Sequence, residues 1–215
     1  MKKPIGALCV ITDVSIQSRY SHLELCELAI RGGARVIQLR DKTASDRELY
    51  ALAVAMQLIC TGLGATFIIN DRVDIALAAN TDGVHLGQTD LPIPVARTIL
   101  GNDKLIGGTA STLEEALQVE RNGADYIGFG HIFPTTTKLK STPPKGIDSL
   151  REVMASVKIP VMAIGGINHT NIEAVARTGV ASIAVVSAVC ASENPMLAAR
   201  KLSHIISAIR SHAHH

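Results

Sequence analysis

The sequence contains no tryptophan, and only 3% of its 215 residues are aromatic. Proteins that bind single-stranded nucleic acid stack the bases on aromatic side chains, and proteins that bind duplexes present a strongly basic surface. The formal net charge here is only +2. We therefore expect no nucleic-acid partner.

Long apolar segments are also absent. The longest run, residues 181–191, contains two serines, and a membrane-spanning helix needs about 20 apolar residues. Lys2 and Lys3 precede a short apolar stretch that ends at Asp13, but no small-residue cleavage site follows. We expect no membrane partner and a cytoplasmic location.

Cysteines are few, and none form a Cys-x-x-Cys pair, which excludes zinc ribbons and thioredoxin-type redox sites. We expect reduced, buried thiols, as is usual in the cytoplasm. The four cysteines are Cys9, Cys26, Cys60 and Cys190.

With 47% hydrophobic and 19% charged residues, the chain can form one folded domain over residues 1–215. One pattern recurs in residues 31–37, 121–127 and 177–183: a cation, a glycine two residues later, and then an apolar strand. This pattern is typical of a helix that ends at a left-handed glycine before a buried strand.

Eight short apolar runs without polar alternation predict parallel strands covered by helices. Capping boxes at Ser45, Ser111 and Ser149 predict three helix starts, Asn168 predicts a fourth, and a final apolar stripe predicts a helix over 195–210. The fold class is therefore α/β, a (β/α)₈ TIM barrel. An open doubly wound sheet is the alternative, but residues 128–133 lack the third glycine of a dinucleotide-binding loop. The predicted strands are residues 8–11, 36–39, 67–69, 84–86, 104–106, 126–129, 161–164 and 183–186.

The carboxyl ends of barrel strands form the active-site mouth. Gln38, Arg40 and Lys42 alternate at the end of the second strand, so they point the same way and suit a polyanion such as a diphosphate. A salt-bridged strand end is the alternative. Asp71 and Asp90 follow adjacent strands and suit Mg²⁺, although each is also suited to cap the helix that follows it.

Two further segments suit phosphate groups. Gly165, Gly166 and Ser187 end the last two strands, where backbone N–H groups of such barrels bind phosphate, and residues 135–138 offer three hydroxyls and a lysine. A plain tight turn and a solvated loop are the alternatives. Together the mouth predicts an enzyme that joins or rearranges two phosphorylated small molecules with Mg²⁺.

At these residues the sequence resembles the thiamine-phosphate synthase family over nearly its whole length. The resemblance rests on motifs that are specific when taken together. They are Gln38–Lys42, Ile69–Arg72, Gly83–Asp90, Gly123–Gly130, Ile132–Lys138, Ile164–Ile167 and Val186–Ser187.

The resemblance implies a transferase that condenses hydroxymethylpyrimidine diphosphate with hydroxyethylthiazole phosphate to give thiamine phosphate and diphosphate. It implies that Asp71 and Asp90 hold Mg²⁺ and that Arg40, Lys42 and Lys138 are catalytic. The implied substrate-binding residues are Gln38, Leu39, Arg40, Asp41, Lys42, Asn70, Thr109, Thr135, Thr136, Thr137, Lys138, Gly166, Val186 and Ser187.

Two residues depart from the synthase pattern. Thr109 stands where the synthases usually have serine, and His131 stands where they usually have proline. The Gly-His-aliphatic-Phe string resembles a sister family, the thiazole tautomerases, in which this histidine is an acid–base group. The complete set of diphosphate and metal residues favours the synthase. A phosphosugar isomerase or aldolase, or a regulator without turnover, also remains open.

Three other expectations concern positions outside these motifs. His85 lies within a predicted strand and is expected to be a satisfied barrel histidine, and the histidines from His212 onward form a tail without a fixed metal geometry. The loop at 138–146 is expected to close over substrate. A homo-oligomer, most simply a dimer, is expected because such assemblies are common on this barrel.

Overall fold

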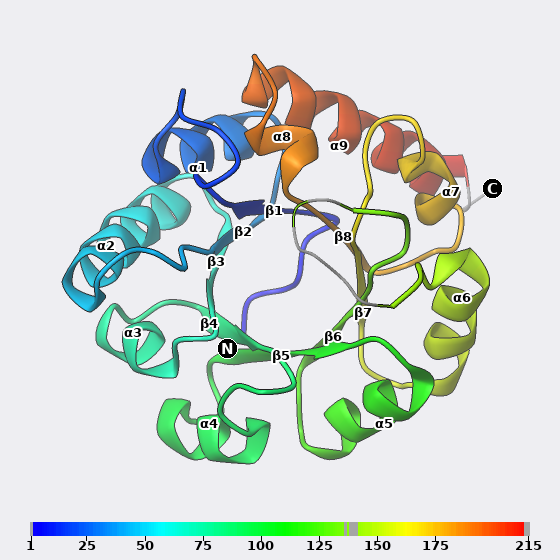
Figure 1. Cartoon of the computed structure of the whole chain (residues 1–215), viewed down its shortest axis with the longest axis horizontal. Coiled ribbons are helices and arrows are strands. Elements are labelled where there is room, and N and C mark those ends of the chain that lie inside the picture. The colour runs from blue at the N-terminus through cyan, green and yellow to red at the C-terminus, as the bar shows by residue number, and fades with distance from the viewer. Residues whose placement is uncertain (1, 136, 138–141, 213–215) are drawn as a thin grey trace.

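The computed structural model describes residues 2–135, 137 and 142–212. Eight parallel strands pair in sequence order, and β8 pairs with β1 to close the barrel (Figure 1). This confirms the predicted (β/α)₈ fold. The strands are β1 Leu8–Thr12, β2 Val36–Leu39, β3 Thr66–Asn70, β4 Gly83–Leu86, β5 Leu105–Ala110, β6 Tyr126–Gly130, β7 Val161–Ile164 and β8 Ser182–Val185.

Helices follow the strands and cover the outside of the barrel (Figure 1). Two of them, α8 and α9, follow β8. Within the described residues the helices are α1 His22–Arg31, α2 Asp46–Gly62, α3 Val73–Ala78, α4 Ile93–Leu100, α5 Leu113–Arg121, α6 Gly146–Ser156, α7 Ile172–Ala176, α8 Ser187–Cys190 and α9 Pro195–His212.

Two strands differ from their predicted bounds in ways that affect the site. β5 begins after Lys104 and runs on through Thr109 to Ala110, because Gly107 and Gly108 continue the ladder to β6. β8 ends at Val185, so Val186 lies outside the strand and precedes α8. Thr109 therefore projects from within a strand rather than from a loop.

The predicted capping box at Ser45 is confirmed, and Ser21 makes a second one. Three other predicted starts are wrong. The hydroxyl of Thr112, not Ser111, accepts the Glu115 amide, and α6 already begins at Gly146 rather than near Ser149. Asn171, not Asn168, immediately precedes α7, and α9 runs to His212 rather than ending at residue 210.

The recurring glycine pattern is confirmed. Gly33, Gly123 and Gly179 have φ of 106°, 83° and 78°, and each follows a helix end. A residue without Cβ adopts this left-handed conformation without strain. The repeat therefore sets the tight turn that returns the chain from helix to strand.

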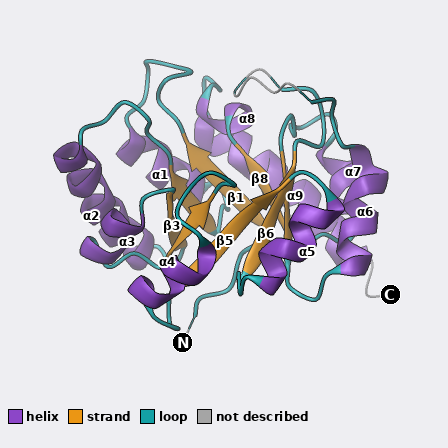
Figure 2. Ribbon diagram, turned by 60° about the horizontal axis from the view of Figure 1, so that its bottom comes forward, coloured by secondary structure: helices purple, strands orange, loops and turns teal. Residues whose placement is uncertain are grey.

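The first residues close the end of the barrel opposite the strand carboxyl ends (Figure 2). Lys2 pairs with Asp125 and Lys3 pairs with Asp82. The Thr66 hydroxyl donates to the carbonyl of Pro4 at 3.0 Å, and Ile5 packs against the apolar cluster inside the barrel. The predicted active-site mouth is at the other end, which these residues leave open.

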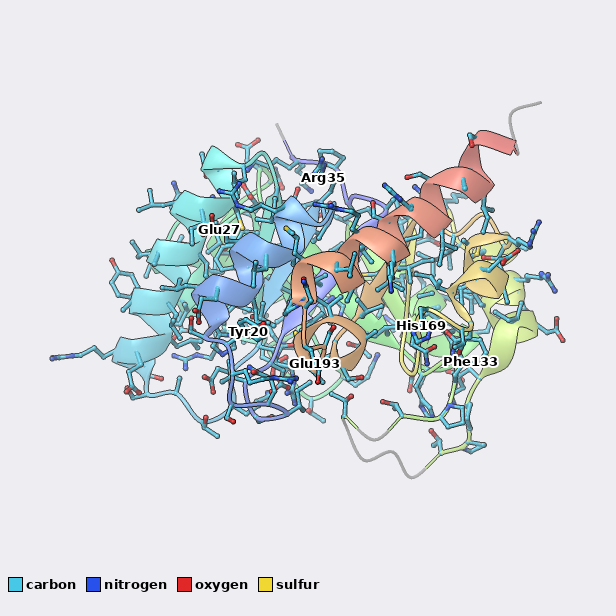
Figure 3. The ribbon with its side chains drawn as sticks, turned by 90° about the horizontal axis from the view of Figure 1, so that it is seen from above. Tyr20, Glu27, Arg35, Phe133, His169 and Glu193 are labelled. Atoms are coloured by element: carbon cyan, nitrogen blue, oxygen red, sulfur yellow. The ribbon has the colours of Figure 1, made fainter. Side chains whose placement is uncertain are left out.

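The segment before α1 packs on the turn between α8 and α9. The Tyr20 hydroxyl donates to the carbonyl of Glu193 at 2.8 Å, and Figure 3 shows Tyr20 and Glu193 near each other, with Arg35 toward the opposite end of the barrel. All four cysteines are free and buried, as predicted. Across the described residues, no helix has the length and apolar character to cross a membrane.

Candidate active site

A cavity opens at the carboxyl ends of the strands and brings together most of the predicted site residues. It receives side chains from β2, β3 and β5 and from the segments after β6, β7 and β8. The predicted site residues that line it are Gln38, Arg40, Asn70, Thr109, His131, Thr135, Thr137, Gly166, Val186 and Ser187.

The other predicted residues lie around this cavity or outside the part of the chain that the structure describes. Leu39 is a buried strand residue, and Lys42 is exposed beside Asp71. The Asp41 carboxylate turns back toward the protein, where it accepts from the Thr43 and Ala44 amides. Thr136 and residues 138–141, which include Lys138 and the first part of the loop predicted to close, lie outside the described residues.

Arg40 is held by Asp13, a residue that we did not select from the sequence. Asp13 follows β1, is only 3% exposed and pairs with the Arg40 guanidinium. Its other oxygen accepts from the Ser15 amide at 3.0 Å. A buried carboxylate needs such partners. The pairing joins the ends of the neighbouring strands β1 and β2. In the sequence Asp13 is visible only as a polar residue after a strand.

Asp71 and Asp90 meet at the ends of β3 and β4. Burial opposes ionisation of Asp71, but hydrogen bonds with Lys42 and Asp90 outweigh burial and lower the pKa of Asp71. Burial and the hydrogen bond with Asp71 raise the pKa of Asp90. The two carboxyl groups are therefore close enough for each to change the proton affinity of the other.

The helix-cap interpretation of these aspartates is wrong. α3 follows Arg72 and α4 follows Pro92, and neither helix start has a side-chain cap. Asp90 instead accepts from the Gly87 amide at 2.6 Å. No group of three or more metal-binding side chains occurs within the described part of the chain, but Mg²⁺ is commonly held by one or two carboxylates together with water and substrate phosphate. The paired carboxylates fit such an ion.

His85 lies in the wall of the cavity with both ring nitrogens partnered. Nδ1 lies 3.1 Å from the Tyr126 hydroxyl and Nε2 lies 2.9 Å from the Thr109 hydroxyl. Burial lowers the pKa of His85 to about 4, although Asp71 opposes this. The ring is therefore neutral at pH 7. The expectation of a satisfied barrel histidine is confirmed, and the structure adds that this histidine faces the cavity.

Two strand glycines make room for this group. A Cβ on Gly107 would lie 2.1 Å from Cζ of Tyr126, and a Cβ on Gly128 would lie 2.7 Å from Cε1 of His85. Real Cβ contacts are not this short, so only glycine leaves space here. The glycines in β5 and β6 therefore shape the cavity wall.

The far side of the cavity is formed after β7 and β8. Gly165 and Gly166 have φ of 99° and 66°, and a Cβ on Gly166 would lie 2.3 Å from the carbonyl oxygen of Pro134. Asn171 donates to the carbonyl of Gly166 at 2.9 Å. The turn thus brings the backbone close to Thr135 and Ser187, which line the same cavity.

Known proteins resemble the whole barrel and not only this site. A model of the family described as thiamine monophosphate synthase matches residues 8–189. The chain belongs to this family. A thiamine-phosphate synthase from Chlorobium luteolum is 52% identical over 95% of this chain and 94% of its own. One from Chloroflexus aurantiacus is 47% identical over 96% and 95%.

Solved structures agree. Thiamine phosphate pyrophosphorylase from Pyrococcus furiosus has a TM-score of 0.88 and 42% identity, covering 94% of this chain and 96% of its own. A 3-hexulose-6-phosphate synthase, with a TM-score of 0.70 and 18% identity over 93% and 99%, shares the fold alone. The relatives with high identity are thiamine-phosphate synthases, so this member of the family is an enzyme, a transferase.

His131 is the residue that suggested the tautomerase alternative. It is 6% exposed, lines the cavity and packs against Gly165, where a Cβ would lie 2.3 Å from Cβ of His131. Relatives that are 44–52% identical are thiamine-phosphate synthases, so the tautomerase alternative is not favoured. A histidine at this position is therefore compatible with the synthase family.

Proposed function

We propose that this enzyme condenses hydroxymethylpyrimidine diphosphate with hydroxyethylthiazole phosphate, forming thiamine phosphate and releasing diphosphate. The observation that carries the proposal is one cavity with candidate anion-binding groups at two ends. Arg40 and Gln38 line one side, Gly166 and Ser187 line the other, and the relatives have the matching name. A substrate pair with a diphosphate and a phosphate fits both ends.

The diphosphate is proposed to bind at the carboxyl ends of β2 and β3. Arg40, Lys42 and Asn70 present donors there, and Lys138 and Thr136 are proposed to complete the set. Arg40 is already oriented by Asp13, so little side-chain freedom is lost when the anion binds. Two cations beside the leaving diphosphate stabilise the charge that develops on it.

Asp71 and Asp90 are proposed to hold Mg²⁺. The ion would neutralise charge on the diphosphate as it departs. An ion held there would compete with Lys42 for Asp71. Lys42, which pairs with Asp71 in the free enzyme, would then be available to the diphosphate.

The reaction is proposed to be a dissociative substitution. The C–O bond to the diphosphate breaks first and leaves a pyrimidine methylene cation, and the lone pair of the thiazole nitrogen then forms the new C–N bond. No protein base is needed, because that nitrogen carries no proton. A neutral His85, held by Thr109 and Tyr126, adds no positive charge beside this cation.

The thiazole phosphate is proposed to bind at the turn after β7 and the start of α8, through Thr135, Thr137, Gly166, Val186 and Ser187. Glycines let an anion approach the backbone closely, so that backbone N–H groups can donate hydrogen bonds to it. Closure of the loop at 138–146 would then exclude water from the cation. Four buried free thiols are consistent with a cytoplasmic enzyme.

Diphosphate release from purified protein tests the proposal. Release should require both organic substrates and Mg²⁺, and it should survive His131→Pro because proline is the usual residue of the synthases. Tautomerisation of a carboxylated thiazole phosphate, lost in His131→Pro and accompanied by no diphosphate release, would contradict it.

A further inference from the structure

A buried histidine lies behind the diphosphate-binding end and outside the cavity. His22 is the first residue of α1 and is 4% exposed. The Ser21 capping box fixes the helix start and leaves the His22 ring turned into the protein. Nδ1 lies 2.8 Å from the Thr12 hydroxyl, and Nε2 lies 3.2 Å from Oδ2 of Asp41.

The two contacts define the proton positions on a neutral ring. Asp41 is an acceptor only when ionised, so Nε2 must carry the proton. Nδ1 then accepts from the Thr12 hydroxyl, whose other partner, the carbonyl of Gln38, is at the longer distance of 3.4 Å. Burial lowers the pKa of His22 despite the nearby Asp41 and Asp13, in agreement with the neutral ring.

Asp41 links His22 to the loop between β2 and α2. Its Oδ1 accepts from the Thr43 amide at 2.8 Å, the Thr43 hydroxyl at 2.8 Å and the Ala44 amide at 3.0 Å. Burial opposes ionisation, but these bonds and the one with His22 lower the pKa of Asp41 to about 2. The carboxylate thus ties the loop backbone to α1.

Arg40 and Lys42 are the direct neighbours of Asp41 in this loop. The Arg40 amide also donates to the carbonyl of Thr12 at 3.2 Å, so Thr12 contacts both the ring and the cationic segment. With Asp41 turned inward, its charge does not face the site proposed for the diphosphate. We propose that His22 is a positioning residue that, through Asp41, holds the loop carrying Arg40 and Lys42 in its diphosphate-binding arrangement. This inference rests on the proposed function for its kinetic readout only.

The first test is His22→Phe, which keeps a ring of similar size but removes both hydrogen bonds. Loss of one hydrogen bond to a charged group predicts about tenfold faster hydrogen exchange of the Thr43 and Ala44 amides. The Michaelis constant for the pyrimidine diphosphate should rise about tenfold, while that for the thiazole phosphate stays within about twofold. His22→Gln, whose amide can still donate to Asp41, should bring the exchange rates and the Michaelis constant part of the way back to their wild-type values.

Thr81→Val is the matched control. The Thr81 hydroxyl is buried and donates to the carbonyl of Gly83 at 3.1 Å, at the start of β4 and so at the other end of the barrel. The Thr81→Val variant should lose stability without changing the exchange of the Thr43 and Ala44 amides or the ratio of the two Michaelis constants. If His22→Phe does not fold, His22→Asn, which is too short to span Thr12 and Asp41, is measured in the same way.

Unchanged exchange of the two amides in folded His22→Phe or His22→Asn would overturn the inference, as would equal rises of both Michaelis constants in that variant. The exchange measurement needs no turnover. If the enzyme has no synthase activity but His22→Phe still shows faster exchange of the loop amides, the proposed function is contradicted. The role of His22 in holding the loop is then still supported.

Discussion

Single side chains at the mouth are held by partners far away in the sequence. Asp13 orients Arg40 across 27 positions, and Asp71 holds Lys42 across 29. The alternation of residues along a strand predicted that Gln38 and Arg40 point the same way, and both line the cavity. Lys42 lies beyond the end of β2 and pairs with Asp71 instead. Asp13 and His22 were not selected, because ion pairs and hydrogen bonds between different strands and helices leave no spacing to read.

Replacing Asp90 with asparagine should affect stability and activity in opposite directions. The asparagine side chain keeps an oxygen for the Gly87 amide and removes the repulsion with Asp71, so metal-free stability should rise by about 0.5–1 kcal/mol. Mg²⁺-dependent turnover should fall at least about 100-fold. Denaturant unfolding and a Mg²⁺ titration measure the two effects, and unchanged turnover in Asp90→Asn would remove this residue from the metal site.

His85 makes stability depend on pH. Its pKa is about 4 in the folded protein and 6.5 as the ordinary value, so the unfolded chain binds the proton more tightly. The stability is fully present above pH 6.5 and is lost as the pH falls toward 4, by at most about 3 kcal/mol. His22 contributes with the same sign.

The measurement therefore compares the acid-induced loss of unfolding free energy in the wild type with the loss in His85→Gln. Urea unfolding at pH 7 and pH 4.5 should show a smaller acid loss in the variant, because a glutamine side chain does not titrate. Equal losses in the two proteins would show that His85 is not held neutral by its surroundings.

At the scale of elements, the apolar runs predicted the barrel because buried parallel strands need little else. The prediction failed where other residues decide the bounds. β5 was predicted too short because two glycines interrupt its apolar run. Gly107 leaves space for Tyr126 and His85, and Gly108 leaves space for Val119 and Ile93. α6 was assigned a late start because Ser149 resembles a cap, while the helix begins at Gly146, three residues earlier.

Gly128→Ala tests this account of β6. Its Cβ would lie 2.7 Å from the His85 ring, so the variant should lose about 1–3 kcal/mol of stability and most of its activity. Gly62→Ala, at the end of α2 with no atom within 4 Å of the added Cβ, should be neutral or stabilised by up to about 1 kcal/mol. Thermal unfolding and turnover of both variants measure this, and equal behaviour would contradict the packing argument.

At the scale of the whole molecule, the two ends of the barrel have separate tasks. One end is closed by the first residues through Lys2, Lys3 and Pro4, and the other carries the cavity. Removing residues 2–5 should therefore lower the free energy of unfolding by about 2–4 kcal/mol and leave the Michaelis constants within about twofold. A large change in substrate binding at a temperature where the truncated protein is folded would show that the ends are coupled.

The measurement that tests the central claim most directly is identification of the product by mass spectrometry and NMR after incubation with both phosphorylated substrates and Mg²⁺. The account predicts thiamine phosphate with a new bond from the pyrimidine methylene to the thiazole nitrogen, one diphosphate per product, and no product without Mg²⁺ or either substrate. Recovery of both substrates unjoined by a folded protein would contradict it.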